Sequence, residues 1–276
     1  MSLSKRLQTH EPLRNSPYRL FLYLQIHGTG VMVLKLKRIL AGCLCIGCVL
    51  GALYLGAKPW IDKEASQSES RRLAQHIDGP ANGPPERRTF DWDAILAENP
   101  AVVAWLQVPE TGIDTCIVQG ADDRYYLDHA ADGTPSNIGA AFLDANCPPD
   151  FSADCSIIFG HSVLYTGGMF TDLKDFCSET FFHQVPAFWI WTPDGDYRCH
   201  VMSVYKGEAK DAACYQYDFG SDRKAVLERL EEQALFYRDR LVTDDDHLVT
   251  LSTCDLDYGL DSTRRIALTG LLEPVR

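Results

Sequence analysis

The sequence predicts a mainly β domain, a closed or nearly closed barrel of eight strands with peripheral helices, preceded by an N-terminal transmembrane helix. Three observations lead to this prediction. Eight short apolar runs lie between residues 102 and 272, separated by Gly, Pro, Asn and Asp, which is typical of small barrels. One amphipathic helical pattern interrupts these runs, and a long uncharged run precedes all of them. With 276 residues and 46% hydrophobic content, the chain is large enough for one compact domain behind an N-terminal extension.

The uncharged run covers residues 39–57 and reads ILAGCLCIGCVLGALYLGA. It is long enough to cross a bilayer at about 1.5 Å per residue. Seven basic residues and one acidic residue precede it, and positively charged flanks stay in the cytoplasm. A cleaved signal peptide and a buried core helix are the alternatives, but the run is long for a signal peptide and ends in a poor cleavage site. We therefore expect a single-pass protein of the cell membrane with a cytoplasmic N-terminus and an extracellular domain.

Four segments follow from this pattern: a cytoplasmic basic N-terminus (1–38), a transmembrane anchor (39–57), a linker (58–87) and the barrel domain (88–276). Residues 62–90 are polar and then rich in Gly and Pro, with few aliphatic side chains that could join a core. This composition favours a short helix followed by a spacer. The next residues, 90–98, predict a short helix that begins near Asp91 and ends before Pro100.

The predicted strands are residues 102–108, 113–118, 140–143, 156–159, 187–192, 197–205, 247–252 and 266–272. A longer helix is predicted between the sixth and seventh strands, in residues 223–240. Its apolar side chains fall on one face at helical spacing, which indicates core packing and no chemical role: Val226, Leu227, Leu230, Ala234 and Leu235.

Charge excludes one class of partner. Beyond residue 58 the chain carries 18 Lys and Arg against 37 Asp and Glu. Such an acidic surface repels phosphate backbones and anionic lipid, so we expect no nucleic acid partner.

Seven cysteines follow the predicted anchor: Cys116, Cys147, Cys155, Cys177, Cys199, Cys214 and Cys254. An odd number leaves at least one free thiol in an exported domain, and the spacing gives no pairing for the others. No C-x-x-C pair occurs among them, which argues against structural zinc. The acidic run 244–246 lacks the spacing of a calcium loop. We expect no obligatory metal and no cofactor.

Three chemically competent residues lie at strand ends. The seventh strand carries Cys254 out at its exit, where an inert buried cysteine is not expected. The eighth strand opens with Arg264 and Arg265, and antiparallel pairing of the two strands would bring these residues to the same edge. The fourth strand delivers His161 at its end, after Gly160, which allows a tight backbone turn.

Each of these residues has an ordinary explanation when it is taken alone. A cysteine in an exported domain is more often paired or buried, a histidine more often structural, and an arginine at a strand start more often a solvated charge. It is their combination at strand ends that predicts a site on a rigid scaffold.

The motif TLSTC followed by RIALTG, with IIFGHS upstream, resembles the signature of the sortase family. Class B of that family is indicated by residues 99–120, by DDRYYLDH (122–129), by IGAAFLD (138–144) and by GGMFTDL (167–173). The resemblance covers residues from about 88 to 276 in the family's order. The family pattern places hydrophobic residues directly after its arginine, which selects Arg265, with Arg264 as the fallback.

The resemblance implies a sortase-type barrel and a cysteine transpeptidase. In this reading Cys254 attacks the Thr carbonyl of an Asn-Pro-x-Thr-x-like sorting signal, and His161 transfers protons. Arg265 holds the carbonyl or its oxyanion, while Ser252 and Thr253 help to position the substrate or Cys254. The implied partners are secreted proteins bearing a C-terminal sorting signal and a peptidoglycan precursor amine, as in lipid II.

Three alternatives differ in function. A pilus-polymerising sortase would use the same residues with a pilin lysine as acceptor. A papain-like peptidase would place its cysteine before its histidine, which is the reverse of the order here. An anchored adhesin without enzymatic activity would need no free thiol.

Overall fold

The computed structural model describes residues 17–79, 85–164, 166–210, 212–259 and 262–275. The chain divides into two units, Met1–Lys58 and Pro59–Arg276. Helix α1 (Pro17–Leu73) begins in the first unit and continues into the second, with Pro59 inside it. From Lys35 onward this helix contains a window with a mean hydropathy of 2.2, so it is long and apolar enough to cross a membrane.

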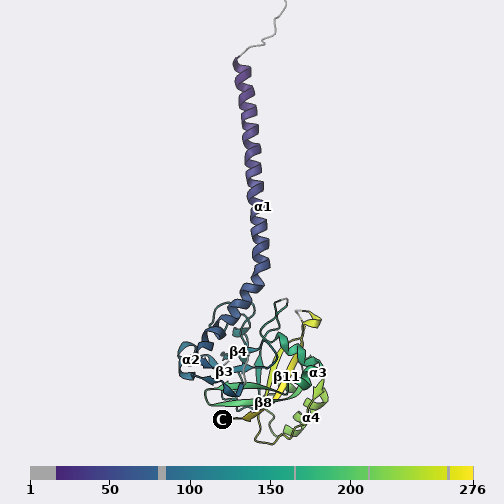
Figure 1. Cartoon of the computed structure of the whole chain (residues 1–276). Coiled ribbons are helices and arrows are strands. Elements are labelled where there is room, and N and C mark those ends of the chain that lie inside the picture. Colours follow the sequence, from purple (N-terminus) through teal and green to yellow (C-terminus); the bar gives the residue numbers. More distant parts are fainter. Residues whose placement is uncertain (1–16, 80–84, 165, 211, 260–261, 276) are drawn as a thin grey trace, which may run out of the picture. The chain divides into compact units, whose positions relative to one another are not determined.

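Eight strands of the second unit close into a barrel in the described residues (Figure 1). Their order is β11-β10-β6-β5-β4-β3-β7-β8, and β8 pairs back onto β11. The strands are β3 (Val102–Gln107), β4 (Asp114–Gln119), β5 (Phe142–Leu143), β6 (Cys155–Phe159), β7 (Ala187–Thr192), β8 (Gly195–Glu208), β10 (Leu248–Cys254) and β11 (Arg264–Pro274). Each of them overlaps one of the eight strands predicted from the sequence, and the closed eight-stranded barrel is confirmed.

Alternating side chains from these strands fill the barrel. Leu106, Ile117, Ile158, Leu251 and Leu268 are all fully buried in one cluster. Because side chains alternate across a strand, this inward set fixes which residues point to the other face of the sheet.

Short elements surround the barrel. They are β1 (Ile77–Asp78), β2 (Thr89–Phe90), β9 (Phe236–Tyr237), α2 (Trp92–Glu98), α3 (Glu179–Gln184), α4 (Arg223–Gln233) and the 3-10 turns η1 (Ala74–His76), η2 (Pro85–Arg87), η3 (Tyr125–Leu127), η4 (Thr171–Cys177), η5 (Ala213–Tyr215) and η6 (Leu256–Tyr258). Helix α2 begins as predicted, since the Asp91 side chain accepts a hydrogen bond from Ala94 N at 3.1 Å.

The predicted helix 223–240 is too long. Helix α4 ends at Gln233, with Val226 and Leu230 buried, and Leu235 is 46% exposed. The backbone N–H of Leu235 donates to Val204 O at 2.7 Å, and β9 then pairs with β8. Pairing with the open edge of β8 replaces the last turns of the helix.

The predicted linker contributes to the packing of the second unit. Leu73, at the end of α1, is fully buried in a cluster with Ile95 and Trp105. Polar side chains add further contacts in this segment. Ser66 Oγ donates to Gly139 O at 2.8 Å, and Cys116 N donates to Ser70 Oγ at 3.2 Å.

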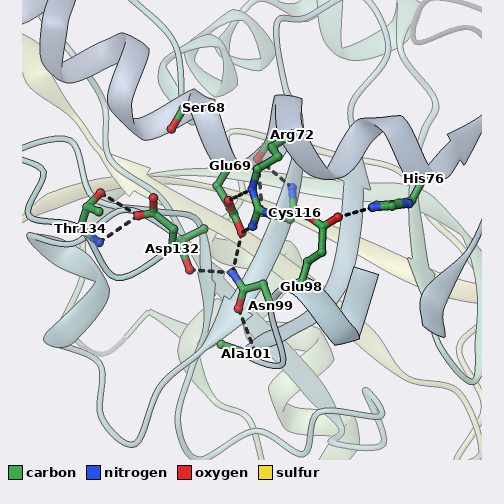
Figure 2. Close-up of polar contacts among 12 residues, drawn as sticks. Ser68, Glu69, Arg72, His76, Glu98, Asn99, Ala101, Cys116, Asp132 and Thr134 are labelled. Atoms are coloured by element: carbon green, nitrogen blue, oxygen red, sulfur yellow. Dashed lines mark hydrogen bonds and ion pairs between the residues drawn. The ribbon is translucent and has the colours of Figure 1, made fainter. Parts of the chain in front are cut away.

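A buried carboxylate completes this contact (Figure 2). Glu69 is 2% exposed and receives two hydrogen bonds from Arg72, at 2.8 and 2.9 Å. Asn99 Nδ2 donates to the same carboxylate at 3.1 Å and also to Ala131 O at 2.8 Å. Arg72 also forms an ion pair with Glu98. The Nε2 atom of His76 lies 2.6 Å from Oε1 of the same Glu98 carboxylate. Because a buried carboxylate is stable only when it is paired and hydrogen-bonded, this network holds the end of α1 in one position.

Candidate active site

The residues predicted to form a site line one pocket of about 210 Å³. They are His161, Ser252, Thr253, Cys254 and Arg265, and Asp123, Leu127, Phe142, Phe159 and Gly160 complete the lining. Three other hollows of the described chain, of about 290, 310 and 460 Å³, are lined by neither Cys nor His. Chemistry and not size therefore identifies the candidate site.

Strand register explains why these residues meet. Strands β10 and β11 are antiparallel, with Cys254 directly opposite Arg265, as expected from the sequence. Strand β6 runs parallel to β10 on its other side, with Phe159 opposite Ser252. Gly160 N then donates to Ser252 O at 3.0 Å, which brings His161 beside the end of β10. Three neighbouring strands thus each deliver one of the three reactive side chains.

The two arginines have different surroundings. Arg265 lines the pocket, and its Nη1 donates to Ser262 O at 2.9 Å and to Arg264 O at 3.0 Å. Arg264 stacks on the Tyr258 ring at 4.3 Å and lies 3.9 Å from Asp255. Successive residues of a strand face opposite sides, so only one of the pair can face the pocket. That residue is Arg265.

A backbone carbonyl orients His161. Its Nε2 lies 2.9 Å from Leu127 O. A carbonyl oxygen can only accept a hydrogen bond, so Nε2 carries the hydrogen. In the neutral ring Nδ1 is then the nitrogen that can accept a proton.

Gly160 is required by packing and not by a turn. Its backbone does not lie in the left-handed region, contrary to the expectation of a tight turn. A Cβ at this position would lie 2.6 Å from Phe170 Cγ. Phe170 is fully buried, and its N–H donates to His161 O at 3.0 Å. Because Gly160 has no side chain, the Phe170 ring can pack directly against the Gly160 backbone.

The two hydroxyl residues before Cys254 have partners within the protein. Ser252 Oγ lies 2.7 Å from Tyr215 Oη, and Thr253 Oγ1 lies 2.9 Å from Ser162 Oγ. Both residues are 2% exposed. Burial raises the pKa of Tyr215, so its phenol stays protonated and can donate to Ser252. These contacts hold the end of β10 in place.

Burial distinguishes Cys254 from five of the six other cysteines of the domain, and only Cys177 is half-buried like Cys254. Burial raises the pKa of Cys116 and Cys155 to about 12 and that of Cys147 to about 11. Such thiols remain protonated and are poor nucleophiles. All cysteines of the described residues are free, and Cys254 is half-buried at the pocket.

Sequence reasoning gave no individual role to several residues around the pocket, among them Asp123, Leu127 and Tyr215. Asp123 and Leu127 come from the segment between β4 and β5, and Tyr215 comes from η5. None of them lies at the end of a long strand, so periodicity gives no signal for them. Within the described residues there is no group of three or more His, Cys, Asp or Glu that could hold a metal ion.

Comparison with known proteins gives a consistent result. No protein-family model matches the chain. It is 28% identical to Sortase B of Listeria monocytogenes over 170 residues, which cover 61% of this chain and 68% of that protein. It is 30% identical to the structure of a Streptococcus pyogenes class B sortase involved in pilus biogenesis, covering 66% of this chain and 98% of that one, with a TM-score of 0.59. A Staphylococcus aureus sortase B–substrate complex, 22% identical over 78% of this chain and 96% of that one, shares the fold with a TM-score of 0.64.

Proposed function

Because the chain belongs to class B of the sortase family, a family of cysteine transpeptidases, we propose that it cleaves a C-terminal sorting signal after Thr and transfers the protein to a cell-wall amine. The observation that carries this proposal is the single pocket that joins Cys254, His161 and Arg265. Membership of this family leaves no support for an adhesin without enzymatic activity.

In the first step the Cys254 thiolate attacks the Thr carbonyl carbon and the peptide bond breaks. The departing amine takes a proton from His161 Nδ1, and a thioacyl bond to Cys254 remains. His161 keeps its Nε2 hydrogen in the bond to Leu127 O, so this ring can exchange its proton without turning.

Arg265 is proposed to hold the carbonyl oxygen as negative charge develops on it. Its Nη1 is occupied by two carbonyls, which fix the guanidinium and leave its other donors for the substrate. Among the described residues no carboxylate forms an ion pair with Arg265, so its positive charge is not neutralised before substrate binds. Donors held in advance in this way stabilise a transition state more than a ground state.

Ser252 and Thr253 are proposed to act through position. Their hydroxyls are buried and paired, which favours a role in holding Cys254 at the strand end over direct contact with the substrate.

The proposed setting is the outer face of the cell membrane. The apolar part of α1 would anchor the protein, with the basic N-terminus in the cytoplasm and the barrel outside. The proposed signal is Asn-Pro-x-Thr-x-like, and the proposed acceptor is the amine of a peptidoglycan precursor such as lipid II.

A pilus-polymerising function is the second candidate. It is supported by the 30% identity to a class B sortase involved in pilus biogenesis. The chemistry at Cys254 would be the same, and the acceptor would be a pilin lysine.

A transfer assay tests the proposal. The full chain in detergent is given quenched peptides with Asn-Pro-x-Thr-x or Leu-Pro-x-Thr-Gly signals and an acceptor with either a glycine or a lysine amine. We expect cleavage after Thr and an amide product, both lost in Cys254→Ala and kept in Cys177→Ala, which removes the other half-buried thiol of the domain. Absence of cleavage with every signal contradicts the proposed activity. A preference for the lysine amine favours the pilus function.

A further inference from the structure

Asp123 provides the negative charge at the wall of the catalytic pocket. It lies in the segment after β4, four residues before Leu127. Its Oδ1 accepts a hydrogen bond from Ala145 N at 2.8 Å, which ties it to the chain just after β5. In the part of the chain that the structure describes, no Lys or Arg forms an ion pair with this carboxylate.

Strand order sets Asp123 and Arg265 on opposite sides of the reacting cysteine. The sheet runs β5-β6-β10-β11, and Asp123 is attached beside β5 while Arg265 is the second residue of β11. His161 and Cys254, from β6 and β10, lie between them. Leu127 O, on the same segment as Asp123, holds the His161 ring. A cationic group bound at Asp123 would therefore lie next to the proton acceptor and across the pocket from the arginine.

The second substrate of the proposed reaction has this charge. An amine acceptor is largely protonated at neutral pH. Burial raises the pKa of the Asp123 carboxyl, and repulsion from Asp144 and Asp122 adds to the rise. A bound cation would relieve both effects.

We infer that Asp123 recognises the incoming amine and selects a positively charged acceptor over water. This inference rests on the proposed function. Asp123 binds the ammonium form and then stabilises the positive charge that develops on nitrogen as the amine attacks.

The bound ammonium loses one proton to water, and the neutral amine attacks the thioacyl carbon. The C–N bond forms as the C–S bond breaks, Cys254 leaves as thiolate, and the second nitrogen proton passes to His161 Nδ1. The product is an amide beside a thiolate–imidazolium pair.

The test compares two nucleophiles in the full chain in detergent. Triglycine carries a charged amine, and hydroxylamine is largely uncharged at neutral pH. The measured quantity is the ratio of transfer product to hydrolysis product, in which any change in the acylation rate cancels. Asp123→Asn removes the charge at the pocket. The control, Asp122→Asn, removes a charge from the neighbouring exposed residue, and Asn can still accept the bonds from Arg124 N and Tyr125 N.

We expect Asp123→Asn to lower the triglycine ratio about fivefold, as the loss of a partly screened ion pair does, and to leave the hydroxylamine ratio unchanged. Asp123→Glu should restore most of the triglycine ratio, and Asp122→Asn should change neither ratio. An equal fall with both nucleophiles, or no fall with triglycine, overturns the inference while leaving the proposed function intact.

A measurement without a variant serves if Asp123→Asn does not fold. Raising the salt concentration should lower transfer to triglycine and not to hydroxylamine in the unaltered chain, because salt screens the ion pair. Equal salt dependence for the two nucleophiles contradicts the role of Asp123. Absence of cleavage by the unaltered chain contradicts the proposed function and the inference together.

Discussion

Leu73→Ala tests whether the end of α1 is an integral part of the barrel domain. Leu73 is fully buried beside Ile95 and Trp105, so its removal leaves a cavity in a packed cluster. Buried Leu→Ala changes cost about 2–5 kcal/mol, and we expect about 3 kcal/mol here. For a unit of this size that corresponds to a fall in melting temperature of about 6–12 °C. Alanine favours helix at least as well as leucine, so the loss reports packing and not helix propensity.

The assay is thermal unfolding of the full chain in detergent, followed by the fluorescence of the buried tryptophans. Leu241→Ala is the matched control. It makes the same change in composition, but Leu241 is 87% exposed. The control should stay within about 0.5 kcal/mol of the unaltered chain. Equal melting temperatures for the two variants would refute this reasoning and would favour a spacer role for residues 58–87.

Three further predictions concern the site and its edge. Arg265→Ala should slow acyl transfer about 10²-fold or more, because it removes the proposed oxyanion donor. Arg264→Ala should change the rate little, since Arg264 faces Tyr258, and steady-state kinetics on both variants would distinguish the two arginines. Among the seven cysteines of the second unit, iodoacetamide should label Cys254 first in the folded protein, and mass spectrometry of the peptides would contradict this if a buried cysteine reacted equally fast. Hydrogen bonds from Lys174 and Lys206 lower the pKa of Asp257 to about 2, so its contribution to stability is present above about pH 4 and lost as pH falls toward 2. Asp257→Asn should therefore lower the free energy of unfolding at pH 6 and not at pH 2, by less than about 1 kcal/mol because the pair is exposed to solvent.

The strands of the barrel could be predicted because their signal is local. Apolar runs bounded by turn residues mark β6, β10 and β11 directly in the sequence. Antiparallel pairing of β10 and β11 follows from their short connection, and it places Cys254 opposite Arg265. The family pattern selected Arg265 over Arg264, and the register of β10 and β11 supports that choice, because one residue of shift would exchange the two faces of the strand.

Other features depend on contacts between distant segments and could not be predicted. The predicted helix 223–240 ends early because residues 236–237 pair with β8 as strand β9. The local sequence pattern contains no information about this edge of β8. The burial of Glu69 depends on Asn99, thirty residues away, so its segment resembles a solvated spacer when it is read alone. Gly160 was correctly singled out, but its reason is the ring of Phe170 and not its own backbone angle.

The order of strands at the pocket also determines where the two charged groups of the proposed reaction lie. Acyl transfer needs a positive group at the carbonyl oxygen and, in the second half, a negative group near the attacking nitrogen. If both charges came from adjacent positions they would neutralise each other as a salt bridge and serve neither step. Here β6 and β10 separate the segment that carries Asp123 from the strand that carries Arg265. The closed barrel fixes this separation, so the same scaffold that brings Cys254 and His161 together keeps the two charges apart and available to the two substrates.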